Sequence, residues 1–162
     1  MDFSRLRVSE VIGAIAGLVM IISLFLEWFA LTNVPQRAAQ DAWVCGEGNF
    51  SCSAWDTFPI LRWLLVAAAL APLILAYLVV TDATLSWPAG EVTTIVGLAA
   101  ITLIGYNGLV QKPKGDSSIQ FGTSLSFGYL LALLAAVALV VAGGMRTLES
   151  GGGAGRKPPA TF

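Results

Sequence analysis

Few side chains in this sequence are of the types that carry out acid–base, nucleophilic or metal chemistry. The 162 residues include no histidine, the commonest general base and metal ligand near neutral pH. The two cysteines are too few for a zinc cage, and the sequence contains no nucleophile elbow or phosphate-binding loop. The sequence therefore predicts a protein that is not an enzyme and that needs neither a cofactor nor a metal ion.

Glu27 is the strongest candidate for an ionisable group with a function. It lies about 19 residues along a helix counted from Val8, or about 29 Å at 1.5 Å per residue, which places it at a membrane interface beside Trp28. The favoured interpretation is a hydrated interfacial carboxylate that pairs with Arg62 or Arg37. The alternative is a ligand or cation site beneath the loop that follows.

Other candidate residues point to contacts between helices. Asn107 lies within an apolar segment, where a hydrogen bond to another helix contributes about 0.6 kcal/mol, so a helix contact is expected ahead of a substrate contact. Gly13 and Gly17 form a GxxxG pattern, which is typical of closely packed membrane helices. Packing within one bundle is favoured over homodimerisation, because each helix already has neighbours.

These residues must be positioned by segments that are long and apolar. The chain is 56% hydrophobic and only 12% charged, whereas a soluble domain has about 25% charged residues. Four apolar segments reach the length of about 20 residues that a membrane span requires. The predicted spans are residues 8–29, 60–80, 92–110 and 121–143. The predicted fold class is all-α: a transmembrane four-helix bundle over residues 1–145, followed by a disordered cytoplasmic tail over residues 146–162.

The first loop, residues 31–59, is the longest segment between predicted spans. It contains Cys45 and Cys52, close enough in sequence for a disulfide that would staple the loop, together with Trp43 and Trp55. The favoured interpretation is an exposed loop whose tryptophans rest at the lipid interface. The alternative is a docking surface for another membrane protein, since tryptophan is also typical of interaction hot spots.

The orientation follows from charge and from the cysteines. An even number of spans puts both termini on one side, and five Lys/Arg residues lie on that side against four on the other. Disulfides persist in oxidising compartments, so the loop with Cys45 and Cys52 is expected outside the cell. Both indications predict a plasma-membrane protein with cytoplasmic N- and C-termini.

The order of features resembles that of small four-span membrane proteins of actinobacterial type. The likeness spans the whole topology and consists of Leu-Phe-Leu-x-Trp-Phe at residues 24–29, a long first loop, and Gly-Tyr-Leu-Leu-Ala at residues 128–132. Glu27 stands where proline is expected in such proteins. The resemblance implies no activity.

The first loop also has features in common with claudin-type proteins. Trp43, Cys45, Cys52 and Arg62 occur in a similar order, but the Gly-Leu-Trp signature is missing before Cys45. The loop also looks too short for a claudin-like extracellular sheet, so convergence on a stapled loop is the preferred explanation.

The function expected from these features is that of an accessory or scaffold subunit acting through protein or lipid contacts. Its expected partners are the lipid bilayer and either another membrane protein or further copies of the same chain. Nucleic acid is not expected, because the net charge of -1 offers no basic surface. The alternative function is a small channel or transporter component with Glu27 at the pore mouth.

Overall fold

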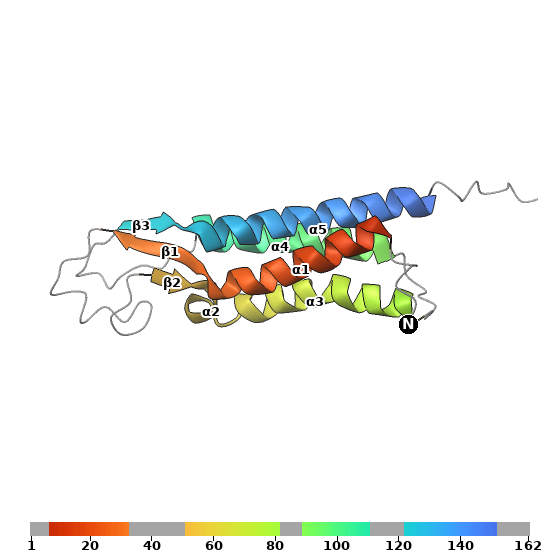
Figure 1. Ribbon diagram of the computed structural model, residues 1–162. Coiled ribbons are helices and arrows are strands. Elements are labelled where there is room, and N and C mark those ends of the chain that lie inside the picture. Colours follow the sequence, from red (N-terminus) through yellow and green to blue (C-terminus); the bar gives the residue numbers. More distant parts are fainter. Residues whose placement is uncertain (1–6, 33–50, 82–88, 111–121, 152–162) are drawn as a thin grey trace, which may run out of the picture.

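Four long helices run side by side in a computed structural model that describes residues 7–32, 51–81, 89–110 and 122–151 (Figure 1). They are α1 (Val8–Phe25), α3 (Leu61–Val80), α4 (Ala89–Leu109) and α5 (Phe127–Gly151). Each helix is long and apolar enough to cross a membrane. The chain therefore has the architecture of a multi-pass membrane protein, as the sequence predicts.

Alanines are prominent in the interior of the bundle beside larger residues such as Met20 and Leu65, and many large apolar side chains cover its outside. Ala69, Ala132 and Ala136 are fully buried, whereas Ile95 and Leu134 are 64% and 65% exposed. A soluble protein would bury such large apolar side chains, but in a bilayer they contact lipid. Helix α5 packs against both α1 and α4, and α1 packs also against α3, while α3 and α4 share a smaller contact.

The small residues bring helix backbones into direct contact. A Cβ atom on Gly17 would lie 2.5 Å from the backbone oxygen of Ala69, and one on Gly13 would lie 3.4 Å from Cβ of Pro72. The GxxxG pattern of α1 thus packs against α3 of the same chain. Helices α4 and α5 approach in the same way, because Gly143 leaves no space for a side chain beside Thr94.

A small antiparallel sheet caps one end of the bundle, which we call the sheet end (Figure 1). The opposite end, where α1 begins and α5 ends, is the terminal end. The strands are β1 (Glu27–Thr32), β2 (Ser51–Ser53) and β3 (Gly122–Leu125), in the order β2-β1-β3. A short helix, α2 (Ala54–Thr57), follows β2 and leads towards α3.

The sheet corrects the all-α prediction and two of the predicted span boundaries. Helix α1 ends at Phe25 instead of Phe29, because Leu26 adopts an extended conformation and Trp28 turns back to donate a hydrogen bond from Nε1 to the Ser23 carbonyl, 2.8 Å away. The fourth helix begins at Phe127 instead of Phe121, because the preceding residues form β3. The structure contains both an apolar four-helix bundle and a sheet.

The three strands of the sheet come from separate parts of the sequence. Only β2 comes from the loop interior, whereas half of β1 comes from the predicted first span and β3 from the beginning of the predicted fourth. The pairs Phe29–Leu125 and Phe29–Cys52 join three segments that are distant in the sequence. Sheet formation here depends on the ends of two helices being neighbours.

Helix α5 extends past the predicted end of the fourth span. It continues to Gly151, so Arg146 and Glu149 lie in the helix, although the sequence predicts a tail there. The remaining residues of the predicted tail, 152–162, lie outside the described residues.

We expect Gly17→Ala to lower the free energy of unfolding by about 1–3 kcal/mol, because the added methyl group would force α1 away from the Ala69 backbone. Unfolding in mixed detergent micelles, followed by circular dichroism, measures the change. Gly105→Ala is the matched control, since a Cβ there meets no atom within 4 Å. Equal stability of the two variants would contradict the close contact.

Candidate functional site

A cluster of aromatic rings fills the sheet end below β1. Trp28 and Phe29 are fully buried there. The Trp28 ring meets the ring of Tyr129 on α5 edge-on, with centroids 5.7 Å apart, and lies 6.4 Å from Phe58. The Phe29 ring contacts Phe58 at 6.1 Å. These contacts fix the position of the sheet on the helices.

A second group of rings surrounds the Arg62 guanidinium at the beginning of α3. Its carbon lies 5.0 Å from the ring centroid of Trp55 and 5.7 Å from that of Trp63, which are cation–π distances. Nη1 of Arg62 also donates a hydrogen bond to the Trp55 carbonyl at 3.1 Å. Phe25 stacks on Trp55 with centroids 4.9 Å apart. We call Phe25, Trp55, Arg62 and Trp63 the Arg62 cluster.

Helix α2 holds Trp55 in this position. Its N-cap, Ser53, accepts a hydrogen bond from the Asp56 amide at 3.2 Å and donates one to the Asp56 carboxylate at 2.6 Å. Thr57 donates back to the Ser53 carbonyl at 2.7 Å. These bonds stabilise a single helical turn directly after β2, and that turn carries Trp55 towards α3.

Glu27 and Arg62 do not form the expected pair. Glu27 is exposed at the start of β1, opposite Ser53 in the sheet register. Among the ion pairs of the described residues, none joins it to Arg62, whose guanidinium contacts the two tryptophan rings and the Trp55 carbonyl instead. The other predicted partner, Arg37, lies outside the described residues.

The cysteine pair falls only partly within the described chain. Cys52 is fully buried in β2, opposite Phe29, and no described cysteine is free. Cys45 and Trp43 lie outside the described residues, so the Cys45–Cys52 disulfide stays a prediction.

Asn107 forms a different hydrogen bond from the one expected. Its side chain on α4 is nearly buried, and Nδ2 donates to the Leu103 carbonyl at 2.9 Å. This acceptor is in the same helix, one turn earlier. A short amide side chain often bonds to its own backbone in this way, so Asn107 does not join two helices through that bond.

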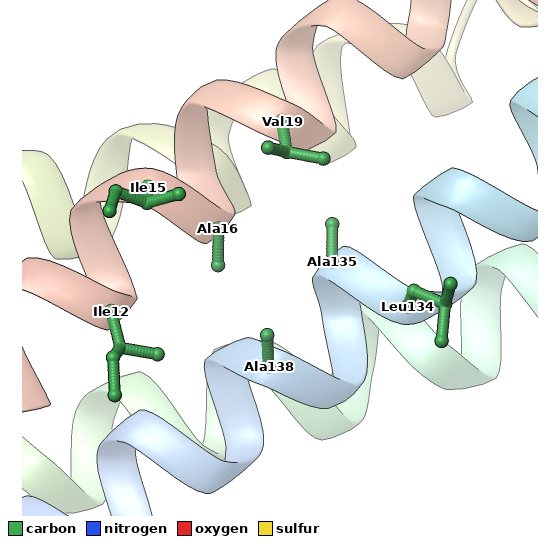
Figure 2. Close-up of a pocket in the computed structure, with 7 residues that line it drawn as sticks. All are labelled: Ile12, Ile15, Ala16, Val19, Leu134, Ala135 and Ala138. Carbon is green, nitrogen blue, oxygen red and sulfur yellow. The ribbon is translucent and has the colours of Figure 1, made fainter.

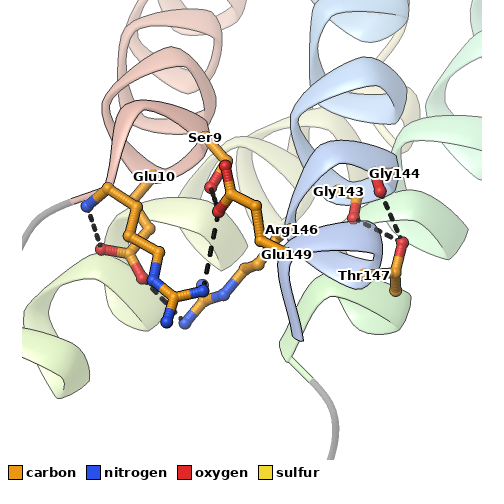
Figure 3. A network of polar contacts seen from close by, with 8 residues as sticks. Ser9, Glu10, Gly143, Gly144, Arg146, Thr147 and Glu149 are labelled. Carbon is orange, nitrogen blue, oxygen red and sulfur yellow. Dashed lines mark hydrogen bonds and ion pairs between the residues drawn. The ribbon is translucent and has the colours of Figure 1, made fainter. Parts of the chain in front are cut away.

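A network of charged side chains at the terminal end was missed in the sequence analysis (Figure 3). Glu10 on α1 and Arg146 on α5 form an ion pair of 3.0 Å, and their side chains are only 4% and 15% exposed. The Glu10 carboxylate also accepts a hydrogen bond from the Arg7 amide at 3.2 Å. Ser9 donates to the Glu149 carboxylate at 3.0 Å, and Arg7 lies 3.8 Å from that carboxylate.

The network satisfies its buried charges within the protein. Ser9, Glu10, Thr93 and Arg146 border a cavity of about 10 Å³, which is close to the smallest volume that holds one water molecule. Because Glu10 is neutralised by Arg146, the arrangement ties the first turn of α1 to the last turns of α5. The described residues include no group of three or more His, Cys, Asp or Glu side chains that could hold a metal ion.

The sequence did contain a signal for this network. Opposite charges occur near the beginning of the first span and just after the end of the fourth, and these two points lie at the same depth when four spans alternate in direction. Because the fourth span is predicted to end at Gly143, Arg146 falls in the predicted tail and is not recognised as a partner of Glu10.

Comparison with models of protein families, with curated proteins and with solved structures finds no match. The class of the protein therefore follows from its own structure: a four-helix, multi-pass membrane protein that carries a small sheet at one end and a buried ionic network at the other.

We expect Arg146→Met to lower the free energy of unfolding by about 3 kcal/mol, because it leaves the Glu10 carboxylate buried without its counter-charge. The double variant Glu10→Gln/Arg146→Met should regain most of this loss. Arg7→Ala is the control, since its side chain is 57% exposed and its ion pair contributes about 0–1 kcal/mol. Additive losses in the double variant, measured by unfolding in detergent, would rule out the pairing.

Proposed function

We propose that this protein is a non-enzymatic accessory or scaffold subunit that binds another membrane protein through the Arg62 cluster. The observation that carries the proposal is a half-buried guanidinium at cation–π distance from two neighbouring tryptophan rings at the sheet end, one of which is exposed. Tryptophan and arginine are the residue types most enriched at interaction hot spots.

The shape and exposure of the Arg62 cluster favour binding. Phe25 and Trp63 are each 58% exposed, and neighbouring Ile60 is 76% exposed, so large apolar side chains are accessible around Arg62. Stacking on Phe25 and the hydrogen bond from Arg62 hold Trp55 in one position. A surface that is already ordered loses less conformational entropy when a partner binds.

Removing the rings should weaken association without preventing membrane insertion. We expect Trp63→Ala to reduce the partner recovered with the tagged protein from its native membrane by about tenfold, which is typical of a hot-spot residue. Quantitative mass spectrometry after extraction in mild detergent measures the recovery. Tyr77→Ala is the matched control, because Tyr77 is 59% exposed near the other end of α3.

The outcomes of this experiment separate the candidate functions. A protein recovered in fixed ratio with the wild type and with Tyr77→Ala, but lost with Trp63→Ala, supports the accessory role. Equal recovery with both variants contradicts a role for the Arg62 cluster. A wild-type sample that contains only this chain favours the alternative, a small channel, and a liposome flux assay of the same sample then tests that function.

We also propose that Cys45 and Cys52 form a disulfide and that the sheet end faces the cell exterior, with both termini in the cytoplasm. Burial of Cys52 in β2 supports the disulfide, because a bridge there would anchor the first loop to the sheet. The orientation is supported by the excess of one Lys/Arg residue on the terminal side and by the redox requirement of the bridge.

Thiol labelling in intact cells tests the disulfide and the orientation together. After the cells are lysed in denaturant, neither cysteine should react with a maleimide until a reductant is added. An impermeant reductant applied to intact cells should make both thiols reactive, because the bridge lies outside. Labelling before reduction would disprove the disulfide. A disulfide that the impermeant reductant does not reduce in intact cells would indicate the opposite orientation.

A further inference from the structure

An apolar groove opens between α1 and α5 on the side of the bundle (Figure 2). It has a volume of about 260 Å³. Ala16, Ala135 and Ala138 point into the space between the two helices, where larger side chains would fill it (Figure 2). Ile15 and Leu134 border the groove and are 56% and 65% exposed, so it opens towards the lipid.

The groove lies near the middle of the two helices, because its lining residues bracket the midpoint of α1 and reach that of α5. Along α1 it runs from Ile12 to Val19, which are about 6 Å and about 17 Å from the start of the helix at 1.5 Å per residue. Half of the hydrocarbon thickness is about 15 Å. The groove therefore starts at acyl-chain depth in the leaflet at the terminal end and reaches the centre of the membrane, a depth that one acyl chain of that leaflet spans.

A pair of opposite charges lies above the groove on the same two helices. Ser9 is one turn before Ile12, and its hydroxyl donates to the Glu149 carboxylate at 3.0 Å. Arg7 lies 3.8 Å from the same carboxylate, and the side chains of Arg7 and Glu149 are 57% and 35% exposed. A cation and an anion that are both accessible at head-group level complement the phosphate and the ammonium of a zwitterionic lipid.

The groove is too short to be the contact surface of a spanning helix. From Ile12 to Val19 it covers about 10 Å of depth, whereas a helix that crosses the bilayer packs along about 30 Å. A single acyl chain enters from one leaflet only and needs no polar partner in the groove. The length, depth and apolar lining therefore fit a lipid chain better than a second copy of this protein.

We propose that the α1–α5 groove binds one acyl chain of a phospholipid from the leaflet at the terminal end, with the phosphate on Arg7 and an ethanolamine head group beside Glu149. This lipid site is separate from the Arg62 cluster and does not depend on the accessory function. The bound chain fills the space that Ala16, Ala135 and Ala138 leave between the helices.

Filling the groove with a side chain tests the proposal. The protein is placed in nanodiscs of phosphatidylethanolamine and phosphatidylglycerol, released into the gas phase, and weighed by native mass spectrometry. The wild type should retain one phospholipid, with phosphatidylethanolamine preferred. Ala138→Phe should retain about tenfold less, because every methylene group displaced from the groove loses its apolar contacts. Val137→Phe is the matched control, since Val137 is the adjacent residue of α5, is 44% exposed and does not line the groove.

Two further variants test lipid binding in the groove if Ala138→Phe does not fold. Leu134→Ala removes an exposed wall of the groove and should also lower retention, while Glu149→Gln should reduce the preference for phosphatidylethanolamine over phosphatidylglycerol. Equal retention by the wild type, Ala138→Phe and Leu134→Ala overturns the proposal. A dimer that disappears in Ala138→Phe while lipid retention is unchanged also overturns it, because the groove would then hold a second copy.

Discussion

Direct contact between helix backbones is the constraint on which this structure depends. Lipid tails are as apolar as leucine, so burial of apolar surface does little to hold helices together in a bilayer, and close packing must do more. Gly17 allows α1 to reach the backbone of Ala69, and Gly143 allows α5 to reach Thr94. Many large aliphatic side chains are then left on the outside, where they contact lipid.

Helices α1 and α5 are joined at both ends by quite different interactions. At the sheet end, β1 continues from α1 and pairs with β3, which leads into α5. At the terminal end, Glu10 of α1 pairs with Arg146 of α5. Between these two contacts the helices face each other through alanines, and the small side chains leave a groove in the middle of the helix pair.

The two ends of the described bundle also differ in how their charged side chains are stabilised. The sheet end concentrates aromatic rings, and the half-buried guanidinium of Arg62 lies at cation–π distance from two of them. The terminal end pairs its charges within the bundle, so that a carboxylate with 4% exposure is tolerated near the start of a spanning helix. An exposed aromatic surface suits contact with a partner, and an internally satisfied ionic network suits the fixing of helix ends.

The sequence alone determined the number and the approximate extent of the four long helices. The length of an apolar run is a local property, and a run of about 20 residues is long enough to cross the bilayer as a helix. It also indicated close packing through Gly13 and Gly17, although not the partner helix. Only the tertiary structure decided that residues 27–29 leave the helix for a strand, that Arg62 contacts tryptophan rings instead of Glu27, and that Glu10 meets Arg146. Each of these depends on segments far apart in the chain becoming neighbours. One of the two strands that pair with β1 begins at residue 122, and the partner of Glu10 lies 136 positions further along the chain than Glu10. Hydropathy gives no information about such pairings, because it measures the preference of each residue for an apolar environment and does not identify a partner residue.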